Sequence, residues 1–168
     1  MIPARLAHLL PAILALAACS GDRVVVSDIG LRYSRAELGR AADGRDLRTV
    51  VQGNPFGAPG FAEAVAGIMT RTGIGVRTRF ATAPGPTALP DYFVSVVVNP
   101  QPDANPFDLC RQAPFTTAPA KRPIVVRAAF CITGGEATAV TGYLDDATGP
   151  DDPGFVSLVQ NLTLRLFP

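Results

Sequence analysis

The first eighteen residues limit what the rest of the chain can fold into, because they have the pattern of a targeting segment. Arg5 supplies a positive charge, and residues 6–15 form a mainly apolar run. A run of about ten residues is too short to cross a bilayer as a helix, which needs about twenty. We therefore expect residues 1–18 to be a signal peptide that is removed. The mature chain, 19–168, is long enough for one domain.

A short motif, Leu16-Ala17-Ala18-Cys19, closes the apolar run. Two small residues between a leucine and a cysteine resemble the lipobox of bacterial lipoprotein precursors. The resemblance implies that Cys19 receives a diacylglycerol and that the chain is cut before it. Ser20 stands where the family has an aspartate for retention at the inner membrane, so the resemblance implies lipid anchoring at the outer membrane, facing the periplasm. The alternative is an ordinary secretory signal with a chance cysteine at its end.

The composition argues against several classes of function. His8 is the only histidine, so the mature chain has no imidazole for acid–base catalysis, nucleophile activation or metal binding. Fifteen basic residues nearly balance fourteen acidic ones, so no nucleic-acid partner is indicated. We expect no enzyme, no metal and no cofactor. The enzyme mechanisms that remain use paired carboxylates, or a serine with Lys121.

The three cysteines predict one disulfide. Lipidation of Cys19 leaves Cys110 and Cys131 as an even pair in an oxidising compartment. A bond between them is our prediction, and two unpaired cysteines are the alternative.

The mature chain predicts a single α+β domain over residues 46–168, preceded by a tether over 19–45. Within the tether, a capping-box pattern predicts a short helix over 34–42. Residues 24–26 could be an edge strand or could simply lie on the domain. In layout and loop chemistry the mature chain resembles small uncharacterised lipoproteins of Gram-negative envelopes.

The apolar pattern predicts five strands and two helices within the domain. Alternation at every second position indicates strands, and an apolar stripe at helical spacing indicates helices. Residues 100–123 hold six prolines and are expected to form a long irregular loop. In chain order we expect a strand over 47–52, a helix over 59–71, strands over 76–80, 92–99, 124–132 and 136–144, and a C-terminal helix beginning after Asp152. This order predicts a mostly antiparallel sheet of about five strands with two helices on one face.

Strand parity predicts one functional surface. If the helices cover the face that carries the apolar strand residues, Arg77, Arg79 and Arg127 point to the opposite face, and Arg48 can join them. Four guanidinium groups on an open sheet could bind phosphate or carboxylate groups of lipopolysaccharide, peptidoglycan or an acidic partner. The alternative is a solvated face with scattered aspartate partners. Cys131 shares the parity of Arg127, so its disulfide would place the long loop over this face.

Two further segments have both a structural and a functional interpretation. Asp145, Asp146, Asp151 and Asp152 could hold Ca²⁺, but their spacing fits no EF-hand, and helix capping is the simpler interpretation. Residues 53–57 lie between a strand and a helix N-terminus, where backbone amides can receive an anion. They lack the spacing of a phosphate-binding loop, so a structural turn is the simpler interpretation.

Three hypotheses for the function follow from the sequence. The first is a non-catalytic outer-membrane lipoprotein that binds or supports an envelope assembly. Its partners are the membrane, through the lipid, and an envelope protein, lipopolysaccharide or peptidoglycan. The second is a periplasmic module for a small or anionic ligand, and the third is an atypical carboxylate enzyme.

Overall fold

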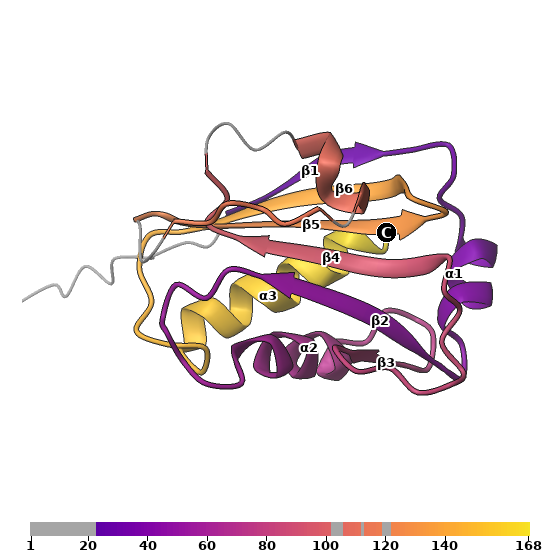
Figure 1. Ribbon diagram of the computed structural model, residues 1–168, viewed down its shortest axis with the longest axis horizontal. Coiled ribbons are helices and arrows are strands. Elements are labelled where there is room, and N and C mark those ends of the chain that lie inside the picture. The colour runs from indigo at the N-terminus through magenta and orange to yellow at the C-terminus, as the bar shows by residue number, and fades with distance from the viewer. Residues whose placement is uncertain (1–22, 102–105, 112, 119–121) are drawn as a thin grey trace, which may run out of the picture.

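The computed structural model describes residues 23–101, 106–111, 113–118 and 122–168. These residues form a mixed six-stranded sheet with strand order β1-β6-β5-β4-β2-β3 (Figure 1). In chain order the elements are β1 (Arg23–Ile29), α1 (Arg35–Ala42), β2 (Arg45–Gln52), α2 (Phe61–Arg71), β3 (Thr78–Ala81), β4 (Tyr92–Val98), the 3-10 helix η1 (Pro106–Arg111), β5 (Ile124–Ile132), β6 (Gly135–Leu144) and α3 (Pro153–Leu166). The predicted α+β class is confirmed. The predicted signal peptide, Cys19 and Lys121 lie outside the described residues.

The sheet differs from the prediction in its parallel half. β2 pairs in parallel with both β3 and β4, whereas β4, β5, β6 and β1 form successive antiparallel pairs. The expected run of hairpin-like strands therefore begins only at β4, because β2 lies between β3 and β4. β3 has four residues, about 13 Å of strand. The loop over 82–91 can therefore return the chain to the start of β4 without a helix.

Part of the expected tether over residues 19–45 belongs to the sheet, and of the two possibilities left open for residues 24–26 the structure shows the edge strand. β1 pairs antiparallel with β6, with Arg23 opposite Tyr143, and forms the sixth strand at one edge of the sheet. α1 is the predicted short helix, and its capping Ser34 accepts a hydrogen bond from the Glu37 amide. Its inward-facing side chains are buried. The domain boundary therefore moves from residue 46 to the start of β1.

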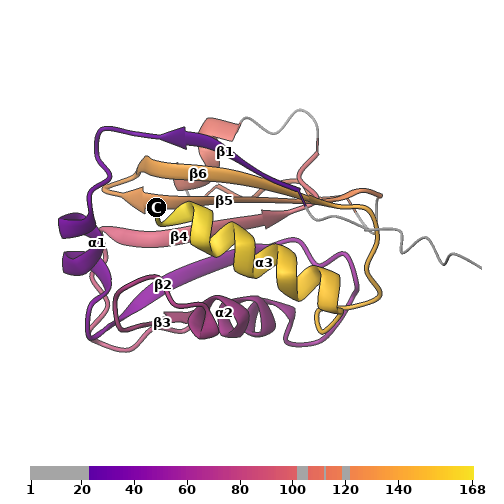
Figure 2. The same ribbon diagram turned by 180° about the vertical axis from the view of Figure 1, so that it is seen from behind.

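Helices α2 and α3 lie on one face of the sheet, as predicted (Figure 2), and the main core is buried between them and the strands. The stripe expected on the first of these helices, Phe61, Val65, Ile68 and Met69, is buried throughout. Three phenylalanine rings, Phe56, Phe61 and Phe155, pack with centroids 5.3–5.8 Å apart. Burial of a side chain of this size contributes about 2 kcal/mol. The two helices therefore leave the opposite face of the sheet for other contacts.

Candidate functional site opposite helices α2 and α3

The sheet face opposite α2 and α3, called here the η1 face, carries a second apolar cluster and four of the predicted site residues, Arg48, Arg79, Arg127 and Cys131. Helix η1 packs on it against β4, β5 and β6 (Figure 1). β4 is buried along its whole length because both of its faces are covered. The second cluster consists of Phe93, Val97, Leu109, Cys110, Ala129, Cys131 and Ala139, with Val50 and Phe115 packed against it.

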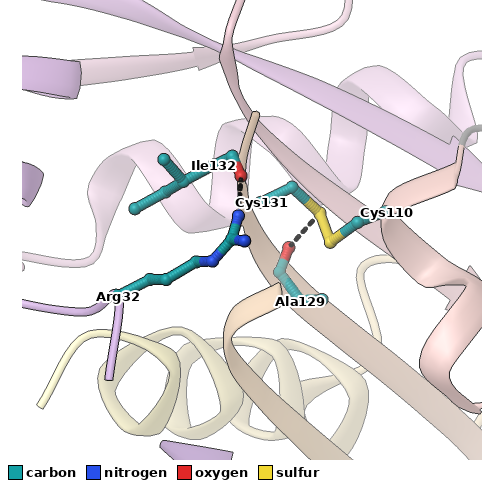
Figure 3. The surroundings of a disulfide bond; sticks show 5 residues. All are labelled: Arg32, Cys110, Ala129, Cys131 and Ile132. Atoms are coloured by element: carbon teal, nitrogen blue, oxygen red, sulfur yellow. Dashed lines mark hydrogen bonds between the residues drawn. A yellow bond between two sulfur atoms is a disulfide. The ribbon is translucent and has the colours of Figure 1, made fainter. Parts of the chain in front are cut away.

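The predicted disulfide is present and fixes η1 to the sheet (Figure 3). Cys110 of η1 and Cys131 of β5 are bonded, with their Cα atoms 5.5 Å apart, and both are buried. The Cys131 Sγ atom lies 3.8 Å from the carbonyl oxygen of Ala129. Close by, the Arg32 guanidinium donates to the carbonyl oxygen of Ile132 at 3.3 Å. The cross-link joins the long loop to this face, as strand parity predicted.

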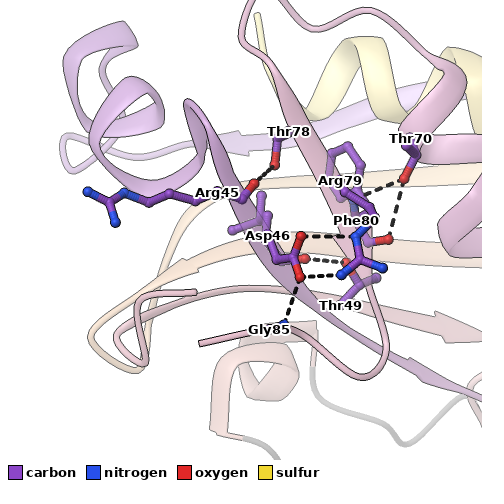
Figure 4. A network of polar contacts seen from close by, with 9 residues as sticks. Arg45, Asp46, Thr49, Thr70, Thr78, Arg79, Phe80 and Gly85 are labelled. Carbon is purple, nitrogen blue, oxygen red and sulfur yellow. Dashed lines mark hydrogen bonds and ion pairs between the residues drawn. The ribbon is translucent and has the colours of Figure 1, made fainter. Parts of the chain in front are cut away.

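Arg79 is held by a carboxylate on the neighbouring strand (Figure 4). Its Nε donates to Asp46 Oδ1 at 2.9 Å, and its Nη2 donates to Asp46 Oδ2. The Gly85 amide donates to the same Oδ2 at 2.7 Å. The hydrogen bond from Arg79, and next that from the Gly85 amide, lowers the pKa of Asp46 below its ordinary value of 3.8. This bidentate geometry is the strong form of an arginine–carboxylate contact, so Arg79 is engaged within the sheet.

Arg77 and Arg48 have separate surroundings. Arg77 precedes β3, its side chain is 92% exposed, and its Nε lies 3.9 Å from Asp43 Oδ1. An exposed pair at this distance contributes little to stability. Arg48 of β2 lies over the Phe93 ring, 4.6 Å from the ring centroid, so it covers part of the second cluster through a cation–π contact.

Arg127 is on the same face as Arg48 but far from it. Arg48 lies opposite Phe93, and Arg127 lies opposite Val97, on β4 between their two strands. Four residues along a strand correspond to about 13 Å, and two strand spacings to about 10 Å. At this separation the guanidinium groups would have to extend toward each other to share one phosphate group, but Arg48 lies over the Phe93 ring and Arg79 is bound by a carboxylate. The structure therefore does not gather the four predicted arginines into one anion site.

The acidic loop between β6 and α3 has structural contacts. Asp152 caps α3 and accepts hydrogen bonds from the amides of Gly154, at 2.9 Å, and Thr148, at 3.1 Å. The amide of Thr148 is the largest cause of the lowered pKa of Asp152. Asp146 pairs with Arg122 at 2.7 Å. Within the described part of the chain, no three metal-binding side chains are grouped together, and the contacts support the capping interpretation.

The connector between β2 and α2 is closed by its own contacts. Asn54 donates through Nδ2 to the carbonyl oxygen of Ala58 at 2.8 Å and accepts from the Ala58 amide at 3.2 Å. Gly53 has φ +84°, and a Cβ atom there would lie 2.3 Å from the carbonyl oxygen of Val98. A cleft of about 490 Å³ lies beside this connector. These contacts support the structural-turn interpretation.

A second cleft, of about 400 Å³, lies between α2 and β3. The Thr70 hydroxyl of α2 accepts from the amide of Phe80 at 2.9 Å (Figure 4). It donates to the carbonyl oxygen of Ala66 at 2.9 Å. Glu63 at the cleft accepts from the Thr82 hydroxyl at 3.2 Å. Helix α2 thereby covers the outer edge of β3, which blocks pairing of another strand there.

Sequence reasoning missed two features of this end of the sheet. Asn99 has φ +49°, and its side-chain oxygen accepts from the amide of Val125 at 2.8 Å. Its carbonyl accepts from the Ala118 amide at 2.9 Å, which ties the returning long loop to the sheet. An asparagine at a strand end was the available signal, because asparagine tolerates left-handed backbone. The second feature is the Arg23 guanidinium, 4.6 Å from the Tyr143 ring centroid. It depends on the pairing of β1 with β6, and a local pattern that suggests an edge strand does not name the partner strand.

Comparisons with known proteins do not place this chain in a family. No family model matches it, and no curated protein matches it. Among solved structures, a PelC dodecamer from Paraburkholderia phytofirmans, carrying one point substitution, matches with a TM-score of 0.44 and 15% sequence identity, covering 88% of this chain and 98% of that one. A likeness at this level assigns neither a family nor a function. No helix in the described ranges is long and apolar enough to cross a membrane.

Proposed function

We propose that this chain is a lipid-anchored protein of the bacterial envelope, which binds another envelope component and catalyses no reaction. The observation that carries the proposal is the motif Leu16-Ala17-Ala18-Cys19, placed immediately before a folded domain. Acylation of Cys19 would hold that domain at the outer membrane on its periplasmic side. Several acyl chains on one residue exceed the two signals that stable anchoring requires.

The disulfide supports export of the chain. Cys110 and Cys131 are both buried and bonded to each other. Structural disulfides persist in oxidising compartments such as the periplasm and are rare in the cytosol. A buried cross-link in the folded domain agrees with a cleaved export signal at the N-terminus.

A binding role is favoured over catalysis and over capture of a small anion. The mature sequence has no histidine, and several described carboxylates are already engaged, Asp46 by Arg79 and Asp152 by the start of α3. The arginines expected to bind an anion are separated along the sheet. A protein or glycan partner that covers a broad surface requires no such convergence. A thermal-shift screen of the mature domain with small anions tests the ligand alternative.

Metabolic labelling in a Gram-negative host tests the anchor. An alkyne fatty acid should label the wild-type chain but not Cys19→Ala, and only the wild type should fractionate with the outer membrane. Cys131→Ala is the matched cysteine control and should keep the label. A folded wild-type chain that takes up no label would refute lipidation.

In-cell cross-linking followed by affinity purification tests the binding role. The wild type is expected to retain a specific envelope protein or glycan that Cys19→Ala loses. A labelled, folded wild type that captures nothing specific would count against the binding role while leaving the anchor intact.

A further inference from the structure

The distance between the proposed lipid and the folded domain is very short. Three residues, 20–22, separate Cys19 from Arg23, the first residue of β1. Four steps along even a fully extended chain span at most about 14 Å. Because β1 is paired with β6 from Arg23 to Ile29, the folded domain itself begins within that reach. An acylated Cys19 would therefore keep the start of β1 close to the lipid headgroups.

This constraint selects one end of the sheet. Arg23 lies opposite Tyr143 near the end of β6, and Tyr143 lies opposite Val125 near the start of β5. In Figure 1 these strand ends are at the left, while α1 and the turn between β5 and β6 are at the right. Ile29, at the other end of β1, is six residues further along, about 20 Å away.

The side chains at this end have the chemistry of a membrane interface. The outermost two rows on the η1 face consist of Arg23, Tyr143 and Val125, and then Val25, Thr141 and Arg127. Val25 is 46% exposed, and Arg23 lies over the Tyr143 ring. Arginine and tyrosine bury an apolar body and keep a polar tip in water. A guanidinium group can also bind a phosphate through two parallel N–H···O hydrogen bonds.

We propose that this corner of the η1 face, formed by the start of β1, the end of β6 and the start of β5, lies against the phospholipid headgroups of the membrane that holds Cys19. The inference rests on the proposed lipid anchor. Arg23 and Arg127 contact headgroup phosphates, and Val25 and Tyr143 enter the interfacial layer. The corner has too few charges to bind a membrane without the anchor, because each arginine near an anionic surface contributes only about a fivefold gain in binding.

The sequence allows a direct test on vesicles. With Cys110 and Cys131 bonded, Cys19 is the one free thiol of the mature chain, and it can be coupled to a maleimide phospholipid. The chain has no tryptophan, so Tyr143→Trp introduces a single indole at the corner. Leu31→Trp is the matched control, because Leu31 is fully exposed and follows the far end of β1.

A nitroxide attached to phosphatidylcholine headgroups should quench the Tyr143→Trp variant strongly and the Leu31→Trp variant weakly. Equal quenching of the two indoles, or stronger quenching at Leu31→Trp, would overturn the proposal. Urea unfolding of both variants before coupling establishes that each is folded.

Charge substitutions test the headgroup contact itself. On vesicles in which about a third of the lipid is phosphatidylglycerol, Arg23→Gln should lower the ratio of docked to undocked domain about fivefold. Arg165→Gln removes the same charge near the C-terminal end of α3 and should leave the ratio unchanged. An unchanged ratio in Arg23→Gln would overturn the contact.

The vesicle test and the cellular test fail separately. Maleimide coupling replaces the cell's acylation, so a missing fatty-acid label on Cys19 refutes the proposed function without altering the vesicle result. Equal quenching on vesicles refutes the docked corner and leaves the fatty-acid label on Cys19 unaffected.

Discussion

Removal of the disulfide between Cys110 and Cys131 should cost about as much stability as the chain-entropy model assigns to the loop that it closes. The two cysteines are 21 residues apart, and a cross-link over that length stabilises the folded state by about 3 kcal/mol at 25 °C through the unfolded chain. The second apolar cluster, which contains both cysteines, is small. We therefore expect η1 to loosen in the variant, whereas the main core between the sheet and α2 and α3 should persist.

The assay is urea unfolding followed by circular dichroism, with Cys19→Ser in every sample to remove the free thiol. The double variant Cys110→Ala/Cys131→Ala should unfold with a free energy about 3 kcal/mol below that of the oxidised protein. Its denaturant slope should rise, because the uncrosslinked unfolded chain exposes more surface. The reduced parent protein separates loss of the bond from loss of the sulfur atoms. A decrease smaller than about 1 kcal/mol in both samples would refute the loop-entropy reasoning.

Three further substitutions test other parts of the fold by the same urea measurement. Gly53→Ala should destabilise the fold by about 3 kcal/mol, because the new Cβ would lie 2.3 Å from the Val98 carbonyl oxygen of β4 and the backbone φ is +84°. Gly149→Ala is the control and should have little effect, because nothing lies within 4 Å of its Cβ. Equal effects of the two substitutions would contradict this reasoning. Because the folded-state pKa of Asp46 lies below its ordinary 3.8, its contribution is present above that value and is lost as the pH falls through the folded pKa. The stability of Asp46→Asn should therefore decline less than that of the wild type on acidification, and parallel pH profiles would contradict the assignment. Phe130→Ala empties a site that is 0% exposed and should cost about 4 kcal/mol; a cost below about 1 kcal/mol would mean that the core is not packed as described.

The individual elements could be predicted because their signals are local. Alternating apolar residues placed a strand over 124–132, which is the extent of β5. Asp152 before Pro153 predicted the start of α3, where the Asp152 side chain accepts from the Gly154 amide. These signals depend on side-chain periodicity and on orphan amides at a helix end, which neighbouring residues decide.

The pairing of strands could not be predicted in the same way, because it depends on contacts far apart in the chain. β1 joins β6 with Arg23 opposite Tyr143, and its exposed side chains, such as Val25, have no clear burial pattern. β2 lies parallel to and between β3 and β4. This arrangement accompanies the packing of α2 against the sheet and the short length of β3. A sequential hairpin was the simpler expectation, and the short length of β3 removes the need for a second helical crossover.

The candidate site shows the same division between local and distant information. Cysteine counting predicted the pair Cys110 and Cys131, which is confirmed. Parity gives the face of a sheet on which a side chain lies, and Arg48 and Arg127 do share one face. Parity does not give the distance between side chains on different strands, because that distance depends on the strand order. Prediction of the contact between Arg79 and the Asp46 carboxylate would likewise have required the register of β2 against β3.

The two edges of the sheet are protected by different means, and the difference bears on how the protein sits in its surroundings. At the β3 edge, the Thr70 hydroxyl occupies the Phe80 amide, and α2 covers the strand. At the β1 edge, where no further strand pairs within the described residues, a bulge between Val26 and Asp28 interrupts the ladder. Bulges and charged side chains limit edge-to-edge association, yet Val25 remains partly exposed beside them. A membrane held at the start of β1 by the proposed anchor would cover that part of the edge, so one contact would both position the domain and protect its open strand.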